Sequence, residues 1–129
     1  MTTDLYYLAW TALLTASLWI VYIAAQVMTN GLLTAENYVD PKPRPVPLWG
    51  QRANRAHLNA VESFAPFAAL VLIAHVAGKA DGTAFWAASF FWLRLAHAIV
   101  YWLGLPLVRT LVFTLGWIAI VGLFFHVIL

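Results

Sequence analysis

The sequence predicts an all-α integral membrane protein built as an antiparallel bundle of four membrane-spanning helices. Of its 129 residues, 64% are hydrophobic and only 9% are charged, whereas an ordinary soluble domain has about 25% charged residues. Four apolar segments are each close to the ~20 residues that cross a hydrocarbon core as a helix. A chain of this composition has too few polar residues to cover a soluble domain, so a membrane is the expected environment.

The four expected spans cover about residues 5–28, 56–77, 83–103 and 107–129. The first has an acidic flank and is too long for a signal-peptide core, so we expect it to be retained. The tight turns "GKADG" and "GLP" make the last three spans antiparallel neighbours. A longer loop, about residues 29–54, contains four alternating prolines and is expected to be extended in its middle. The whole chain, 1–129, is then one membrane domain.

Basic residues set the expected orientation. The long loop and the start of the second span carry Lys42, Arg44, Arg52 and Arg55, and Arg109 follows the "GLP" turn. The opposite side has one lysine, accompanied by two aspartates. Because cytoplasmic loops carry the excess of lysine and arginine, we expect the long loop in the cytoplasm and both termini outside. The basic residues form no contiguous run, so nucleic acid is not an expected partner.

Polar side chains follow one helical face in the second span, at spacing i, i+4, i+7, and one in the third, at i, i+3, i+7. They are Arg55, Asn59 and Glu62, and Arg94, His97 and Tyr101. At helical rise, Glu62 lies about 10 Å and Arg94 about 15 Å from the same side of the membrane. An unpaired charge inside a bilayer is costly, so we expect Glu62 and Arg94 to form an ion pair. With Arg109 at the start of the fourth span, the pattern predicts one polar cavity open to the cytoplasm.

Each of these residues also has a purely structural interpretation. The Glu62–Arg94 pair could only fix helix register, Asn59 and His97 could form interhelical hydrogen bonds, and arginines near helix ends extend to the headgroups. These interpretations leave unexplained why the polar groups gather at one end. A cluster of guanidinium groups suits a small solute with several negative charges, and a nearby arginine would favour the thiolate form of a thiol. The chain has no cysteine and no metal-ligand spacing, so no metal is expected.

Two segments of the sequence resemble the MAPEG family, the membrane-associated proteins in eicosanoid and glutathione metabolism. They are "RAHLNAVESFAPF" (55–67) and "WLRLAHAIVYWLGLPLVRTLVFTL" (92–115). The first resembles the signature of the family's second helix, in which arginine, alanine and histidine are followed by asparagine, glutamate, an aromatic residue and proline. The second is similar to the family's arginine–x–x–histidine–x–x–x–tyrosine helix, its short turn, and the arginine that opens the fourth helix. The similarity is to bacterial-type members related to microsomal glutathione transferase and prostaglandin E synthase.

The resemblance implies a homotrimer of four-helix bundles, with glutathione as co-substrate bound between subunits near the cytoplasmic side. At the matching positions, glutathione would contact Asn59, Glu62, His97, Tyr101 and Arg109. Arg109 would stabilise the thiolate, and Thr110 stands where relatives place a hydroxyl group. The implied activity is transfer of the thiolate to a lipophilic electrophile, or reduction of a hydroperoxide. The lipophilic substrate would arrive through the membrane lipid, which we expect to be that of a bacterial inner membrane.

Three positions depart from the family pattern. Leu58 and Met28 stand where relatives have basic residues, and Phe113 stands where several have an active-site tyrosine. Two alternatives therefore stay open. One is a non-catalytic lipid-binding protein of the same fold. The other is a small transport subunit with Glu62 as its proton-coupled carboxylate, which is disfavoured because an arginine at matching depth would hold that carboxylate.

Overall fold

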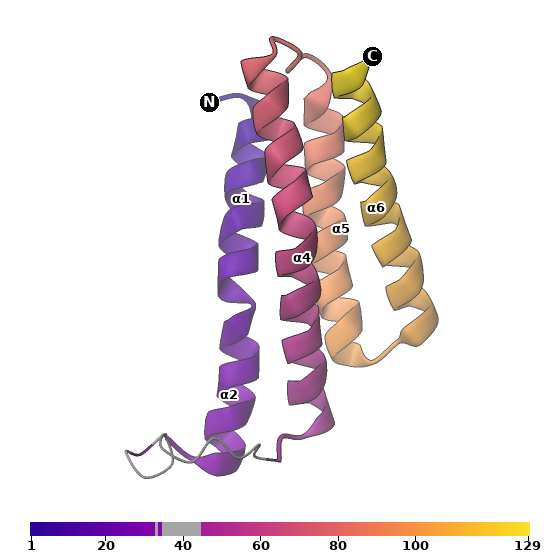
Figure 1. Cartoon of the computed structure of the whole chain (residues 1–129). Helices are drawn as coiled ribbons and strands as arrows, with labels where there is room; N and C mark the ends of the chain where they lie inside the picture. Colours follow the sequence, from indigo (N-terminus) through magenta and orange to yellow (C-terminus); the bar gives the residue numbers. More distant parts are fainter. Residues whose placement is uncertain (33, 35–44) are drawn as a thin grey trace.

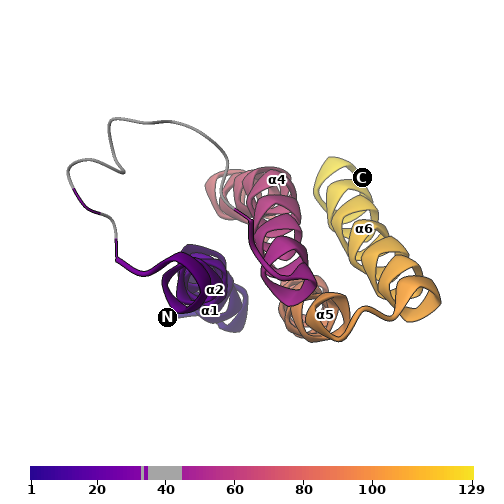
Figure 2. The ribbon, with the colours of Figure 1, turned by 90° about the horizontal axis from the view of Figure 1, so that it is seen from below.

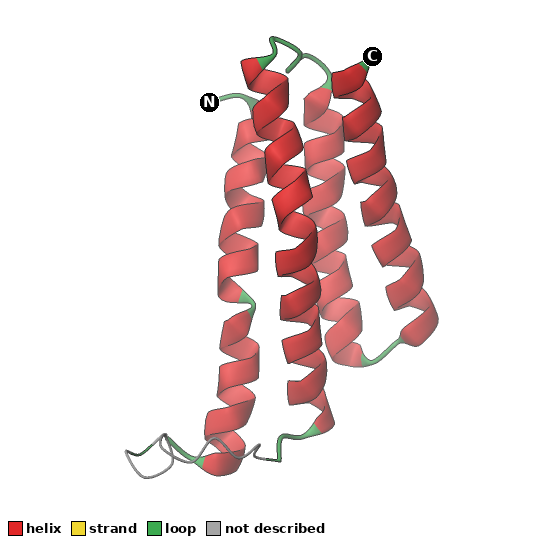
Figure 3. Cartoon of the chain, viewed as in Figure 1, coloured by secondary structure: helices red, strands yellow, loops and turns green. Residues whose placement is uncertain are grey.

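The computed structural model describes residues 1–32, 34 and 45–129, and within them the chain forms helices and turns (Figures 1 and 3). The helices are α1 (Thr3–Ser17), α2 (Trp19–Asn30), α4 (Leu48–Val76), α5 (Thr83–Leu103) and α6 (Pro106–Ile128). α1 and α2 are separated at Leu18 and together make one span. The described residues thus contain four helical segments long and apolar enough to cross a membrane. This confirms the predicted all-α, four-span architecture.

The helices run antiparallel, so the two ends of the bundle carry different residues. Both termini and the α4–α5 turn lie at one end, and the α5–α6 turn and the start of α4 lie at the other (Figure 1). We call the first the histidine end, after His75 and His126, and the second the arginine end, after Arg52, Arg55 and Arg109. Viewed along the bundle, α1–α2 and α6 lie on opposite sides of the α4–α5 pair (Figure 2). α5 packs against α1, α4 and α6.

α4 begins at Leu48, inside the stretch of residues 29–54 that the sequence analysis treats as a loop. Pro47 precedes the helix in an extended conformation, and its carbonyl accepts the backbone N–H groups of Gly50 and Gln51. Proline fits this residue before the helix because its ring fixes φ near −65°, close to the observed −60°. The other features expected of this loop, Pro41 to Arg44, lie outside the described residues. The first turns of α4 therefore place their arginines on a rigid helix.

The core is built from small and aromatic side chains. Its main cluster contains Phe67, Val71, Ala74, Ala87, Phe90, Ala119, Leu123 and Val127. The rings of Phe67 and Phe90 stack with their centroids 4.1 Å apart. A second cluster, nearer the arginine end, joins Leu18, Ala60 and Ala98. Alanines at the contacts let the helix backbones approach closely, as is usual for helices in membranes.

Replacing Gly122 with alanine is expected to lower the free energy of unfolding by about 1–3 kcal/mol, the range for overpacking a filled site. A Cβ atom at Gly122 would lie 2.3 Å from the Trp86 ring, so α6 or the indole would have to move. Gly116 on the same helix is the matched control, because the nearest atoms to a Cβ there are 4.0 Å away. Gly116→Ala should be neutral or slightly stabilising. Denaturant unfolding in detergent measures both, and equal effects would contradict the packing described.

Candidate functional site

A pocket of about 370 Å³ lies at the arginine end, where α4 begins, α5 ends and α6 begins. This volume falls within the ~300–1,000 Å³ typical of small-molecule sites. The lining residues are Leu48, Gln51, Arg52, Arg55, Tyr101, Gly104, Leu105, Pro106 and Arg109. Three of these described residues are arginines and none carries a carboxylate. The pocket therefore has an excess of positive charge from its own side chains.

Arg109 and Tyr101 form one wall of the pocket. The guanidinium carbon of Arg109 lies 4.9 Å from the centre of the Tyr101 ring, a cation–π contact that fixes its direction. The His97 ring meets the Tyr101 ring edge-on, with centroids 5.5 Å apart. Tyr101 and His97 are both buried. His97, Tyr101 and Arg109, which the sequence pattern predicts to share one site, contact one another in a row.

Arg52 joins α4 to the end of α5. The backbone N–H groups of Gly104 and Leu105 bind the carbonyls of Tyr101 and Val100, and Arg52 Nη1 donates to the next carbonyl, that of Trp102, at 3.4 Å. Gly104 has a φ of +74°, and a Cβ there would lie 2.9 Å from the guanidinium carbon of Arg52. Glycine thus serves both the left-handed helix end and the close approach of the guanidinium group.

Arg94 and His97 lie deeper in the bundle, one turn apart on the buried face of α5. Arg94 is only 4% exposed, and its Nε and Nη2 atoms have no hydrogen-bond partner among the described residues. The same is true of Nδ1 of His97. Buried polar groups of proteins are nearly always hydrogen-bonded. Neither residue lines the pocket, so these unpaired atoms lie in the core of the bundle behind its wall.

The Glu62–Arg94 ion pair expected from the sequence is not formed in the single chain. Glu62 lies on the exposed face of α4, and the structure gives it no ion pair with any described residue. Asn59 is half-buried, and its backbone carbonyl accepts a hydrogen bond from the Ser63 hydroxyl at 2.9 Å. Neither Glu62 nor Asn59 lines the pocket of the single chain. α4 thus contributes Arg52 and Arg55 to the pocket, and of these two only Arg55 belongs to the polar face predicted from the sequence.

The hydroxyl expected from Thr110 is bound to its own helix, since it donates to the Pro106 carbonyl at 3.1 Å. Phe113, one turn further along α6, has its ring centroid 5.9 Å from that of His97. Phe113 therefore contacts the buried His97 without offering a donor, and it is not among the residues that line the pocket. Leu58 and Met28, the other two departures from the family pattern, are exposed.

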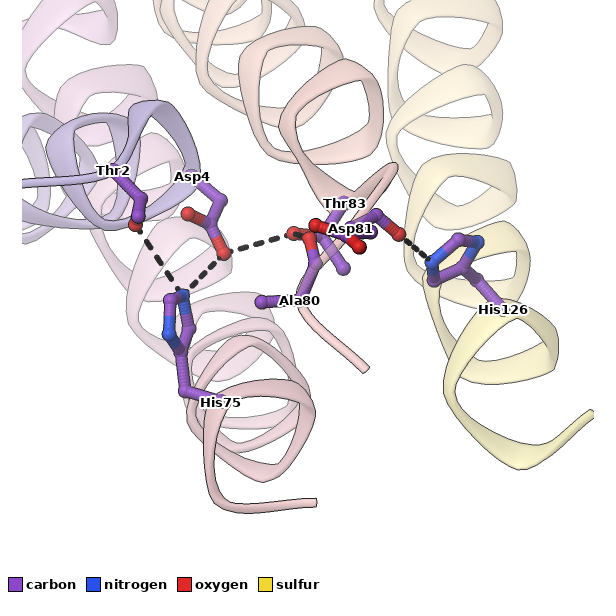
Figure 4. A network of polar contacts seen from close by, with 7 residues as sticks. All are labelled: Thr2, Asp4, His75, Ala80, Asp81, Thr83 and His126. Atoms are coloured by element: carbon purple, nitrogen blue, oxygen red, sulfur yellow. Dashed lines mark hydrogen bonds and ion pairs between the residues drawn. The ribbon is translucent and has the colours of Figure 1, made fainter. Parts of the chain in front are cut away.

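A polar network at the histidine end was not anticipated from the sequence (Figure 4). Asp4 of α1 is 3% exposed, and its Oδ2 accepts His75 Nε2 of α4 at 2.6 Å and the Thr83 hydroxyl of α5 at 2.8 Å. The Thr2 hydroxyl lies 3.4 Å from the same His75 nitrogen. We call Asp4, His75 and Thr83 the polar clasp. In the sequence Asp4 stands out only as a charge that flanks the first span, although antiparallel spans place residues 4, 75 and 83 at one end.

The polar clasp is a structural feature and does not have the geometry of a nucleophile–histidine–carboxylate relay. In such a relay the two partners of histidine bind opposite ring nitrogens, whereas Thr2 and Asp4 both meet Nε2 of His75. His126 likewise connects two elements, because its Nε2 forms a hydrogen bond with the backbone carbonyl of Asp81 in the α4–α5 turn (Figure 4). In the described part of the chain, no three His, Cys, Asp or Glu residues gather as a metal site would require.

Comparison with known proteins identifies the family to which this architecture corresponds. A sequence model described as the MAPEG family matches residues 5–129, nearly the whole chain. No curated protein and no solved structure matches the chain with significance. The match covers all four spans, including the first, which the sequence motifs do not reach.

Proposed function

The chain belongs to the MAPEG family, and on that premise we propose that it binds glutathione at the arginine end and transfers its thiolate to a lipophilic electrophile or uses it to reduce a hydroperoxide. Arg109 stabilises the sulfur anion in this proposal, and the remaining arginines of the pocket bind carboxylates. Tyr101 and His97 fix the direction of the Arg109 side chain. The membrane around the bundle supplies the lipophilic substrate.

The observation that carries the proposal is a pocket lined by three guanidinium groups and no described carboxylate. Guanidinium groups bind carboxylates through paired hydrogen bonds, and they keep their charge at any physiological pH. A ligand with several negatively charged groups is complementary to three such cations. A tripeptide thiol with two carboxylates and an ionisable sulfur meets that requirement.

We further propose that the protein assembles as a homotrimer, because the exposed face of α4 needs a protein partner. Glu62 lies on that face, and a lipid-facing carboxylate inside a membrane is expensive. Ala65 and Ala69 lie on the same exposed face, with the four-residue spacing of small residues that is typical of contacts between membrane helices. Contact between copies would cover Glu62 and bring Asn59 to the site. The Glu62–Arg94 pair remains a proposal for that assembled form.

The proposed orientation puts the arginine end in the cytoplasm, where glutathione and other soluble anionic thiols are made. The positive-inside tendency supports it, since the starts of α4 and α6 carry Arg52, Arg55 and Arg109, while Lys79 lies in the α4–α5 turn at the other end. Both termini would then lie outside.

Isothermal titration calorimetry of detergent-purified protein with glutathione tests the proposal. We expect binding in the millimolar range or tighter, which corresponds to about 4 kcal/mol or more of binding free energy. Binding should weaken at high salt, because exposed charges are screened. Wild-type protein that binds no glutathione at millimolar concentration would contradict the proposed function.

The alternative of a non-catalytic lipid-binding protein is favoured by one observation, the position of Phe113. Its ring lies beside His97, and it has no hydroxyl group to activate a thiol or a substrate. Turnover with a panel of lipophilic electrophiles discriminates the two, because a non-catalytic protein would bind ligands without conjugating them. Transport is less well supported than either. Family membership, rather than an ion pair at Glu62, now provides the argument against it.

A further inference from the structure

Among the three arginines that line the pocket, Arg52 is the one tied to the backbone of another helix. Its Nη1 donates to the Trp102 carbonyl, and its guanidinium group fills the space above Gly104. Arg109 instead stacks on Tyr101, and Arg55 is exposed on α4. A free arginine side chain has about 2 kcal/mol of rotamer entropy to lose on binding a ligand. The contacts of Arg52 already restrict its rotamers, so less side-chain entropy is lost when it binds a ligand.

The remaining donors of Arg52 are available to a ligand. A guanidinium group has five N–H donors in a fixed plane, and the structure shows one of them bound, to Trp102. No described carboxylate forms an ion pair with Arg52. The group is half-buried and lines the pocket. It is therefore a positioned cation without an anionic partner among the described residues.

The charge of the pocket shows what kind of group Arg52 would meet. A ligand with one negative sulfur would balance Arg109 and leave the charges of Arg52 and Arg55 uncompensated. Arg52 lies on α4 and beside the end of α5, whereas Arg109 lies on α6. Anionic groups at separate points of the ligand are needed to reach cations on separate helices.

We propose that Arg52 is a specificity-determining residue, which binds a carboxylate of the thiol ligand and makes the pocket select thiols with a carboxylate remote from the sulfur. This inference rests on the proposed function, because it assumes that an anionic thiol occupies the pocket. It adds a residue that motif matching did not single out. The hydrogen bond to Trp102 positions Arg52, and the ligand carboxylate takes its remaining donors.

The experiment compares three ligands by calorimetry: glutathione and its two monoethyl esters, each of which lacks one carboxylate charge. The proteins are wild type, Arg52→Gln, Arg52→Lys, and Lys79→Gln as a control that removes a charge at the opposite end. Wild type should bind both esters more weakly than glutathione, by about tenfold for the ester that blocks the carboxylate bound to Arg52, the effect of losing a charge-assisted hydrogen bond. Arg52→Gln should bind glutathione and that ester equally, and still discriminate against the other ester. Arg52→Lys should recover part of the discrimination.

The outcomes separate this inference from the proposed function. Wild type that binds none of the three ligands would overturn the proposed function itself. Wild type that binds all three equally, or Arg52→Gln protein that loses affinity for all three by one factor, would overturn only the role of Arg52. The second result would mean that Arg52 acts solely by capping α5. Thermal unfolding of each variant without ligand records that structural effect separately.

Discussion

Replacing Arg109 with alanine is expected to lower kcat for glutathione conjugation by about 100- to 1000-fold, the usual effect of removing a preorganised group that stabilises a reacting anion. Arg109 is half-buried in the pocket, and the ring of Tyr101 holds its guanidinium group in place at 4.9 Å. The proposed role of this cation is to keep the sulfur of bound glutathione deprotonated. The ultraviolet absorbance of the bound thiolate, measured beside the conjugation rate with a chlorinated nitrobenzene, should therefore fall in the variant.

Two further variants make the test of Arg109 specific. Arg109→Lys keeps the charge but loses the planar contact with Tyr101, so it should retain thiolate absorbance with a reduced rate. Lys79→Gln at the histidine end should leave both quantities unchanged. If Arg109→Ala protein kept the thiolate absorbance and the rate of wild type, Arg109 would have no part in activating sulfur.

Replacing His75 with alanine is expected to lower the free energy of unfolding by about 2–4 kcal/mol, because it leaves the buried Asp4 carboxylate with one partner fewer. The polar clasp connects three helices through that single carboxylate oxygen (Figure 4). Asp4→Asn should be destabilising as well. In the double variant the two losses should not add, and the coupling should lie within the ~0.5–3 kcal/mol measured for residues in contact.

Denaturant unfolding in detergent measures the four proteins of this double-mutant cycle. Asp81→Asn is the matched control, since it removes an exposed carboxylate at the same end and keeps the backbone carbonyl that His126 binds. Its effect should stay within about 0.5 kcal/mol. Additive losses in the double variant would show that Asp4 and His75 do not stabilise the fold through their contact.

The sequence was sufficient to predict the helices because membrane-spanning segments are read from length and hydropathy alone. α5 was predicted at its observed bounds, Thr83–Leu103, since "GKADG" and "GLP" interrupt the apolar run on both sides. α4 was predicted to start later than Leu48, because its first turns are polar and project beyond the α5–α6 turn (Figure 1). Hydropathy alone does not mark such polar turns as the start of a helix. A polar helix start next to a proline is the feature to look for in such chains.

The candidate site was predictable where its residues share one helix face, and not where it depends on contacts between chains. His97 and Tyr101 are four residues apart on α5, so their proximity follows from helix geometry. Arg52 lies three residues before Arg55 on α4, which places it beside the same pocket, yet it was counted only as a loop charge. The pairing of Glu62 is different. Its helix face is exposed in one chain, so in the proposed homotrimer its partner would depend on how copies associate, which spacing within one sequence does not encode.

The most direct test of the central claim is an experimental structure of the detergent- or nanodisc-embedded protein with glutathione sulfonate, a stable anionic analogue of the thiolate. We expect the ligand at the arginine end, between the start of α4, the end of α5 and the start of α6. Its sulfonate should contact Arg109, and at least one carboxylate should contact Arg52 or Arg55. A ligand bound elsewhere on the bundle, or a saturated sample with this pocket empty, would contradict the account.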